Sequence, residues 1–142
     1  MYESRQLKTA LKVSIFFLLV TAILHSLSFI GKPEAKNDQE KQLIELTSNY
    51  QMDLGGGIQR TYFEIFTALS SCLTLICLFG GFLLWYFLKN AIEIRLLKGI
   101  LQIYLIVFGT MFIIMACFTF WPPIICSACI FASLIWSRLA AS

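Results

Sequence analysis

Four long apolar runs constrain the fold of this chain more than any other feature of its sequence. They cover residues 13–30, 61–88, 100–120 and 124–139, and the second run contains one charged residue, Glu64. A bilayer core about 30 Å thick is crossed by about 20 helical residues. In lipid, a helix also satisfies its own backbone hydrogen-bonding groups. The sequence therefore predicts an all-α fold, a bundle of four transmembrane helices.

Composition supports this class. Hydrophobic residues make up 58% of the chain and charged residues only 13%, whereas soluble domains carry about 25% charged residues. So few charges cannot cover a water-facing surface, which excludes an ordinary soluble enzyme, a disordered segment and a nucleic-acid-binding module. The length of 142 residues suits one domain. We predict a single integral membrane domain over residues 1–142, with helices at about 10–30, 61–88, 98–120 and 123–139.

Basic residues in the short loops predict the orientation, because cytoplasmic loops carry an excess of Lys and Arg. One side of the predicted bundle carries Arg5, Lys8, Lys12, Lys89, Arg95, Lys98 and Arg138. The other side carries Lys32, Lys36, Lys41 and Arg60 in a longer loop, and an uncharged turn at Trp121-Pro122-Pro123. We expect a multi-pass protein of the cell membrane (the inner membrane of a bacterium) with both termini in the cytoplasm.

The basic residues before the first run also resemble the start of a signal peptide. The apolar run that follows is long for a signal peptide, however, and Ser28-Phe29-Ile30 does not match a small-x-small cleavage site. The sequence therefore favours a retained helix.

The outer loop of about 30 residues, 31–60, is the only sizeable polar segment. Asn37 followed by Glu40 gives a capping-box pattern, which predicts a short amphipathic helix over residues 38–47. Leu43, Ile44 and Leu46 would form its apolar side. Gly55, Gly56 and Gly57 then end any helix, because glycine adopts backbone conformations that other residues avoid. These glycines form either a flexible connector, or a hinge or a place where the backbone closely approaches a ligand.

His25 and Glu64 are the ionisable residues that lie inside the predicted spans near their outer ends. Such groups are costly in a membrane and suggest function. At a rise of 1.5 Å per residue they lie roughly 7 Å and roughly 5 Å deep, so we expect them at matching depth on neighbouring helices. Arg60 lies one helical turn before Glu64. We therefore predict an outward-facing, semi-polar ligand site of His25, Arg60 and Glu64.

Polar and small residues share a face with each of these groups. In the first span this face holds Ser14, Thr21, His25 and Ser28, and in the second it holds Glu64, Ala68, Ser71 and Cys72. A purely structural role stays open, with Arg60 and Glu64 as an i,i+4 ion pair and His25 bonded to a carbonyl or hydroxyl group. One histidine also excludes a multi-histidine metal centre in a monomer, and no metal site is predicted.

The five cysteines all lie in the predicted spans, and Cys126 and Cys129 form a C-x-x-C at the start of the fourth. This placement resembles the four-helix thiol oxidoreductases of the vitamin K epoxide reductase type, which implies catalytic cysteines and a quinone. Those enzymes also use a cysteine pair in an outer segment, which this chain lacks. Buried cysteine often serves as a small hydrophobe, so both roles stay open.

The layout also resembles a family of small bacterial four-helix multi-pass membrane proteins without an assigned activity. The shared pattern is His25-Ser26-Leu27-Ser28-Phe29 late in the first span, then Met52-Asp53-Leu54-Gly55 and Arg60-Thr61-Tyr62-Phe63-Glu64. The resemblance implies the same fold and places His25, Gly55, Arg60 and Glu64 around the outer side.

Together these features favour a non-catalytic membrane protein, either an accessory subunit or a module that binds a lipid or small molecule. The alternative is a membrane thiol oxidoreductase that uses Cys126 and Cys129. No cofactor is predicted for the first hypothesis, and a quinone or a lipid stays open as a bound molecule. The expected partners are membrane lipids and either another membrane subunit or a second copy of the chain, with no nucleic acid.

Overall fold

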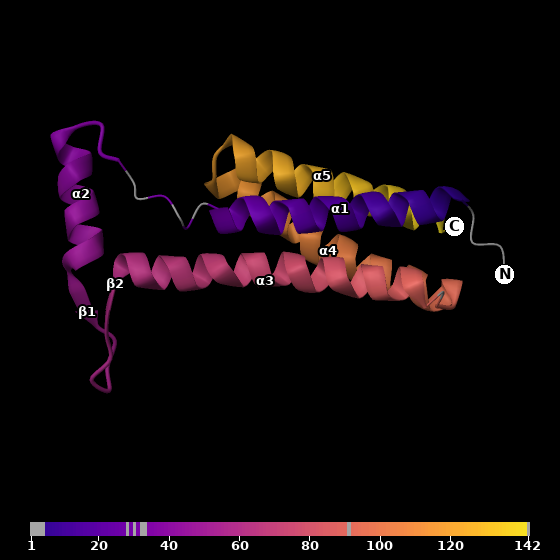
Figure 1. Ribbon diagram of the computed structural model, residues 1–142, viewed down its shortest axis with the longest axis horizontal. Helices are drawn as coiled ribbons and strands as arrows, with labels where there is room; N and C mark the ends of the chain where they lie inside the picture. Colours follow the sequence, from indigo (N-terminus) through magenta and orange to yellow (C-terminus); the bar gives the residue numbers. More distant parts are fainter. Residues whose placement is uncertain (1–4, 28, 30, 32–33, 91, 142) are drawn as a thin grey trace. The chain divides into compact units, whose positions relative to one another are not determined.

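The computed structural model describes residues 5–27, 29, 31, 34–90 and 92–141, and its elements are labelled in Figure 1. In chain order they are α1 (Arg5–Leu27), α2 (Asp38–Asn49), β1 (Gln51–Asp53), β2 (Gln59–Thr61), α3 (Tyr62–Lys89), α4 (Ile94–Phe118) and α5 (Trp121–Ala140). Helices α1, α3, α4 and α5 are long and apolar enough to cross a membrane. The prediction of an all-α fold with four such helices is confirmed.

Two of the long helices begin at least four residues earlier than predicted. Helix α1 starts at Arg5 rather than near residue 10, and α4 starts at Ile94 rather than near residue 98. Lys and Arg are good helix formers, so basic residues extend a helix beyond its apolar part. The predicted end of the first helix at residue 30 lies, with Ser28, outside the described residues.

The link between α4 and α5 is a tight turn, as predicted, but it lies just before Trp121-Pro122-Pro123, because these three residues already form the start of α5. Thr119 and Phe120 alone separate the two helices, and the Thr119 hydroxyl donates a hydrogen bond of 2.7 Å to the Met115 carbonyl. Pro122 and Pro123 lie in the first turn of α5, where the missing N–H of proline costs no helical hydrogen bond.

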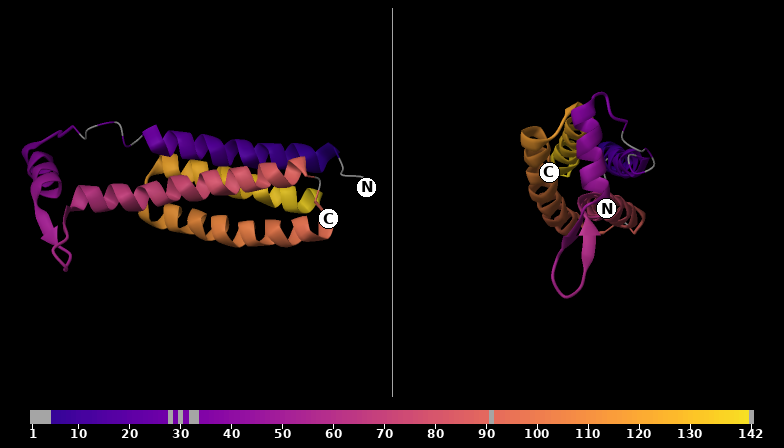
Figure 2. Two further views of the ribbon diagram at one scale, coloured as in Figure 1. Left: turned by 60° about the horizontal axis from the view of Figure 1, so that its bottom comes forward. Right: turned by 90° about the vertical axis from the view of Figure 1, so that its left-hand side faces the viewer.

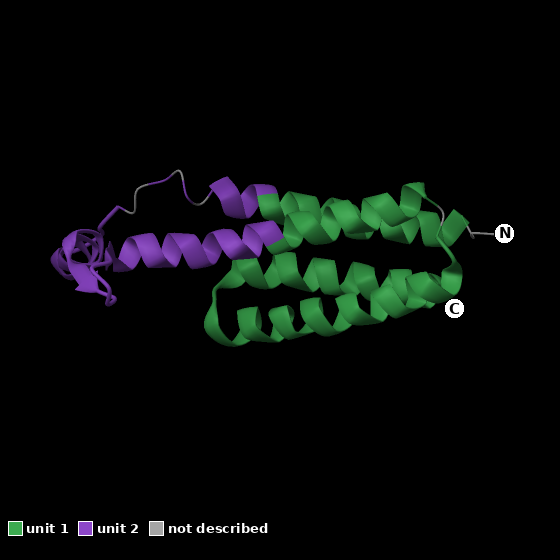
Figure 3. Cartoon of the chain, turned by 90° about the horizontal axis from the view of Figure 1, so that it is seen from below, with its two compact units in different colours: residues 1–22, 76–142 green, residues 23–75 purple. Residues whose placement is uncertain are grey.

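The chain divides into two compact units, which Figure 3 shows in different colours. Unit 1 comprises residues 1–22 and 76–142, and unit 2 comprises residues 23–75. Helices α1 and α3 each contribute one part to each unit.

Unit 1 is a bundle of four helical segments that lie side by side (Figure 2). Each segment buries one stripe of side chains at spacings of three and four residues, the pattern of helices that pack nearly parallel. Helix α4, for example, buries Leu97, Leu101, Tyr104 and Phe108. Other core residues are Leu7, Ala10, Leu11, Ser14, Leu18, Cys77, Leu84, Ile130, Leu134 and Ser137.

Two glycines allow close packing inside unit 1. A Cβ added at Gly109 would lie 2.9 Å from the Phe131 ring of α5, and one at Gly81 would lie 2.9 Å from Cδ2 of Leu19. Helices α4 and α5 make the most extensive contact between any two elements of the described chain. The contact between α4 and α5 therefore requires a residue without a side chain at position 109.

Side-chain hydrogen bonds between described residues join the helices of unit 1. The Tyr104 hydroxyl donates to the Gly80 carbonyl at 2.9 Å, and the buried hydroxyl oxygens of Ser14 and Ser137 lie 3.0 Å apart. Buried polar groups require such partners. These bonds give partners to the Tyr104, Ser14 and Ser137 hydroxyl groups.

Unit 2 contains the polar segment between α1 and α3. Helix α2 begins after Asn37, whose side chain accepts a hydrogen bond of 2.8 Å from the Glu40 N–H. The predicted amphipathic helix and its cap are thus confirmed. The chain then forms an antiparallel β-hairpin in which Met52 pairs with Arg60. These strands were not predicted from the sequence, and each is only three residues long.

Candidate functional site

His25 contacts the backbone of α3. Its Nε2 atom lies 3.1 Å from the Ser70 carbonyl oxygen, and its ring meets the Phe29 ring edge-on at 5.3 Å between centroids. A carbonyl oxygen only accepts hydrogen bonds, so Nε2 must carry the proton of this bond. The hypothesis that His25 bonds a carbonyl and holds two helices together fits this geometry.

The same contact accounts for an unusual threonine one turn further along α3. The Thr74 side chain is 9% exposed, and its hydroxyl oxygen is buried without a hydrogen-bond partner. A helical threonine normally bonds the carbonyl four residues earlier, which here belongs to Ser70. That oxygen already accepts the His25 proton and the helical N–H of Thr74. His25 therefore occupies the acceptor that the Thr74 hydroxyl would take.

Glu64 caps the start of its own helix. Its Oε2 atom accepts hydrogen bonds from the Thr61 N–H at 2.8 Å and from the Thr61 hydroxyl at 3.3 Å. The Thr61 hydroxyl in turn accepts a bond of 3.2 Å from the Glu64 N–H. This reciprocal arrangement is a capping box. The signature Thr61-x-x-Glu64 before an apolar run was visible in the sequence but was not used.

Arg60 does not pair with Glu64. It lies in strand β2, outside the helix, and its guanidinium donates a hydrogen bond of 2.8 Å to the Gln59 carbonyl. The i,i+4 pair requires both residues in one helix, so the interpretation of Arg60 as a helical neighbour of Glu64 is wrong. The capping box explains the difference, because Thr61 caps the start of α3 and so leaves Arg60, the residue before it, outside the helix.

His25 and Glu64 also lie at different levels along α3. His25 is level with Ser70, which is six residues after Glu64, or roughly 9 Å further along the helix axis. The expectation of matching depth is therefore wrong. The polar and small-residue face predicted for the second span is also largely uncovered by other parts of the structure, since Glu64, Ala68 and Cys72 are all exposed. The structure thus does not gather His25, Arg60 and Glu64 into one site.

Gly55, Gly56 and Gly57 form the turn of the hairpin. Their φ angles are 89°, 64° and 80°, in the region that residues with a Cβ rarely adopt. The turn is closed by a bond of 3.0 Å from the Leu54 N–H to the Ile58 carbonyl, and the Asp53 carboxylate accepts the Gly55 N–H at 2.8 Å. The glycines thus hold a defined turn. Their role as a loop hinge stays a prediction.

Cys126 and Cys129 lie in α5 as free thiols, and both side chains are half-buried. Cys126 is the sixth residue of the helix, beyond the first turn whose free N–H groups stabilise a thiolate. This placement does not provide the usual activation of a C-x-x-C motif. Among the described residues, no group of three His, Cys, Asp or Glu side chains could hold a metal ion.

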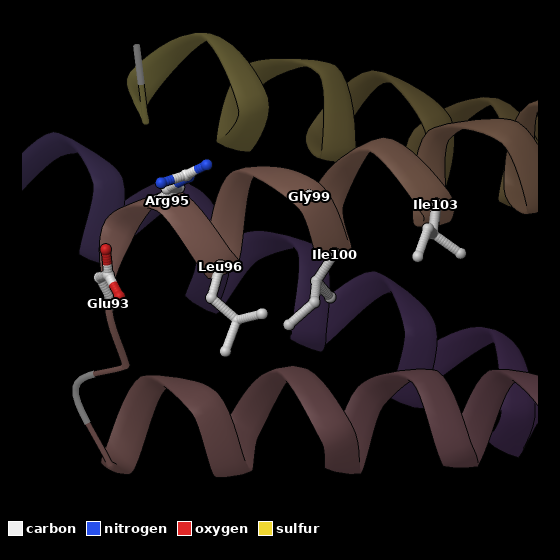
Figure 4. A pocket seen from close by; sticks show the side chains of 6 residues that line it. All are labelled: Glu93, Arg95, Leu96, Gly99, Ile100 and Ile103. Atoms are coloured by element: carbon white, nitrogen blue, oxygen red, sulfur yellow. The ribbon is translucent and has the colours of Figure 1, made fainter.

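A groove in unit 1 is absent from the sequence-based predictions. It lies along the first turns of α4, has a volume of about 590 Å³, and is lined by Glu93, Arg95, Leu96, Gly99, Ile100 and Ile103. Figure 4 shows the two charged side chains at one end of the groove and the apolar side chains along α4. The charges of this segment indicate the orientation of the helices, and a glycine among apolar residues beside those charges is a sequence signal for the groove.

A second uncovered surface lies on α2. Leu43, Leu46 and Tyr50, here called the α2 stripe, are spaced by three and four residues and are each at least 60% exposed. Ile44 and Thr47, one position further round the helix, are half-buried, and α2 contacts β2. Part of the apolar side of α2 is therefore packed within unit 2, and the stripe beside it is uncovered.

The comparisons with known proteins return nothing. The resemblances drawn from the sequence therefore rest on their motif residues alone. The chain matches no known protein family, no curated protein and no solved structure.

Proposed function

We propose that this chain is a non-catalytic accessory subunit of the cell membrane that binds a partner membrane protein through the α2 stripe. The observation that carries the proposal is the exposure of Leu43, Leu46 and Tyr50 outside the four long apolar helices. Exposed apolar side chains on the long helices are explained by contact with lipid. The α2 stripe belongs to a polar segment, where contiguous apolar surface typically marks an interaction site.

The charge of α2 favours a protein over the bilayer surface as the occupant. The helix carries Asp38, Glu40 and Glu45 against a single Lys41, which gives a net charge of −2 (one positive against three negative). Helices that lie on membranes are typically rich in Lys and Arg on their polar face. An acidic helix with an apolar stripe therefore suits a protein surface better.

The helix ends support the proposed orientation. Arg5, Lys8 and Lys12 lie in the first turns of α1, Lys89 ends α3, Arg95 and Lys98 begin α4, and Arg138 lies in the last turn of α5. An excess of basic residues marks the cytoplasmic side. We therefore place both termini in the cytoplasm and the α2 stripe outside.

The test is native mass spectrometry of the full chain, released gently from its own membrane. We expect the wild type to retain a second, different polypeptide. Leu46→Glu places a charge in the stripe and should lower the retained fraction at least tenfold, whereas Ser48→Glu, on the opposite side of α2, should not. A wild-type monomer, or a complex of two identical chains, would contradict an accessory role.

The thiol oxidoreductase alternative has its own test. The protein is incubated with or without an oxidised quinone, denatured, and then labelled with a thiol reagent. If the protein is non-catalytic, we expect the quinone to leave the labelling of Cys126 and of Cys129 unchanged. Cys126→Ser with Cys129→Ser should leave the partner complex intact. Quinone-dependent protection of this pair, with none at Cys117, would instead support the enzyme.

A further inference from the structure

We propose that the groove along the first turns of α4 binds one phosphatidylethanolamine molecule. Arg95 would bind the phosphate, Glu93 would bind the primary ammonium, and an acyl chain would lie along Leu96, Ile100 and Ile103. The groove has a volume of about 590 Å³ and is open along its length. This site is separate from the α2 stripe and does not depend on it.

The polar end of the groove offers one charge of each sign. The side chains of Glu93 and Arg95 are exposed and have no hydrogen-bond or ion-pair partner among the described residues. Arginine is well suited to phosphate, because its planar guanidinium donates two parallel hydrogen bonds. A carboxylate beside it repels an anionic headgroup but accepts hydrogen bonds from an ammonium group. The pair therefore matches a zwitterionic headgroup with a primary amine.

The apolar part of the groove matches a hydrocarbon chain. Leu96, Ile100 and Ile103 are spaced by four and three residues and lie on one side of α4, over a length of roughly 10 Å. Leu96 and Ile103 are both more than half exposed. They lie next to the charged residues on a helix long enough to span a membrane, so headgroup and chain contacts follow each other in the order in which a lipid presents them.

Gly99 supports a role for the groove itself. A Cβ added at this residue would meet no atom within 4 Å. Helix packing therefore does not require glycine here, in contrast to Gly109 on the same helix. Glycine is also a weak helix former. Its effect at this place is to leave the groove open between Arg95 and Ile103.

The test measures how much of three phospholipids, which share the same acyl chains, the full-length protein retains in detergent. Native mass spectrometry counts the bound lipid molecules. We expect the wild type to retain phosphatidylethanolamine at least tenfold more than phosphatidylcholine or phosphatidylglycerol. Glu93→Gln should remove the preference over phosphatidylcholine. Arg95→Gln should lower retention of phosphatidylethanolamine at least tenfold, while Arg5→Gln, at the start of α1, should not.

A substitution at Gly99 tests the contact between the groove and the acyl chain of the lipid. Gly99→Leu should lower retention at least tenfold, and Ala116→Leu, at an exposed position outside the groove on α4, should not, with equal helix content in both variants by circular dichroism. Soluble glycerophosphoethanolamine should compete only weakly. Equal retention of the three lipids, or full competition by the soluble headgroup, would overturn the proposal. Leu46→Glu should leave lipid retention unchanged, which separates this result from that of the partner complex.

Discussion

Replacing Gly109 with alanine is expected to lower the free energy of unfolding of the helical bundle by about 1–3 kcal/mol. The added Cβ would lie 2.9 Å from the Phe131 ring, closer than carbon atoms pack. An aromatic ring cannot bend away as the end of a leucine can. Phe131 is also stacked on Phe112, with 6.0 Å between ring centroids and an interplanar angle of 16°. Helices α4 and α5 must therefore separate, or the stacked rings must move together.

Gly99→Ala is the matched control, because it makes the same change on the same helix where the Cβ meets nothing. Alanine is the better helix former, so this variant should gain about 0.5–1 kcal/mol. Unfolding in mixed detergent, followed by circular dichroism, measures both free energies. Equal changes in the two variants would show that the contact with Phe131 does not limit the α4–α5 packing.

Replacing all three turn glycines with alanine is expected to unfold the β-hairpin. Gly55, Gly56 and Gly57 each have a positive φ, and an L-residue with a Cβ pays about 1–2 kcal/mol in this region. The sum of about 3–6 kcal/mol exceeds what a ladder of three residue pairs sustains, since isolated two-stranded hairpins are marginally stable. The hairpin should therefore unfold completely, while the rest of the structure stays folded.

Amide hydrogen exchange measures this outcome. The Leu54 N–H, which bonds the Ile58 carbonyl, should lose its protection in the triple alanine variant. Asparagine visits positive φ more readily than alanine, so a triple asparagine variant should keep part of that protection. The four long helices should be unaffected in both. Unchanged protection in the alanine variant would mean that the turn does not need the glycine conformation.

The long helices were predictable because their signal is local. Each apolar run has the length of a membrane span, and length together with composition decides the element. The cap at Asn37 was predictable for the same reason, because the capping residue and Glu40 are three residues apart. The ends of α1 and α4 were less predictable, since the hydropathy pattern does not report how far Arg5 or Arg95 extend a helix.

The candidate site was predicted less well than the fold. The sequence shows that His25 and Glu64 are unusual in an apolar run, but it does not fix the level at which two helices meet. Contact with Ser70 decides that level, and it is set by packing between residues far apart in the chain. The cap formed by Glu64 was not predicted for a different reason. A carboxylate at the start of an apolar run suits a ligand as well as a cap, and the residue type alone does not separate the two roles.

The short link at Thr119 and Phe120 has a consequence for the order in which the molecule assembles. Contact between α4 and α5 closes a loop of a few residues, whereas the bond between Ser14 and Ser137 joins positions 123 residues apart. Closing a short loop costs less conformational entropy than closing a long one, and local contacts form faster. We therefore expect the C-terminal helix pair to form first and to provide the template onto which the first helix, although synthesised earliest, docks last.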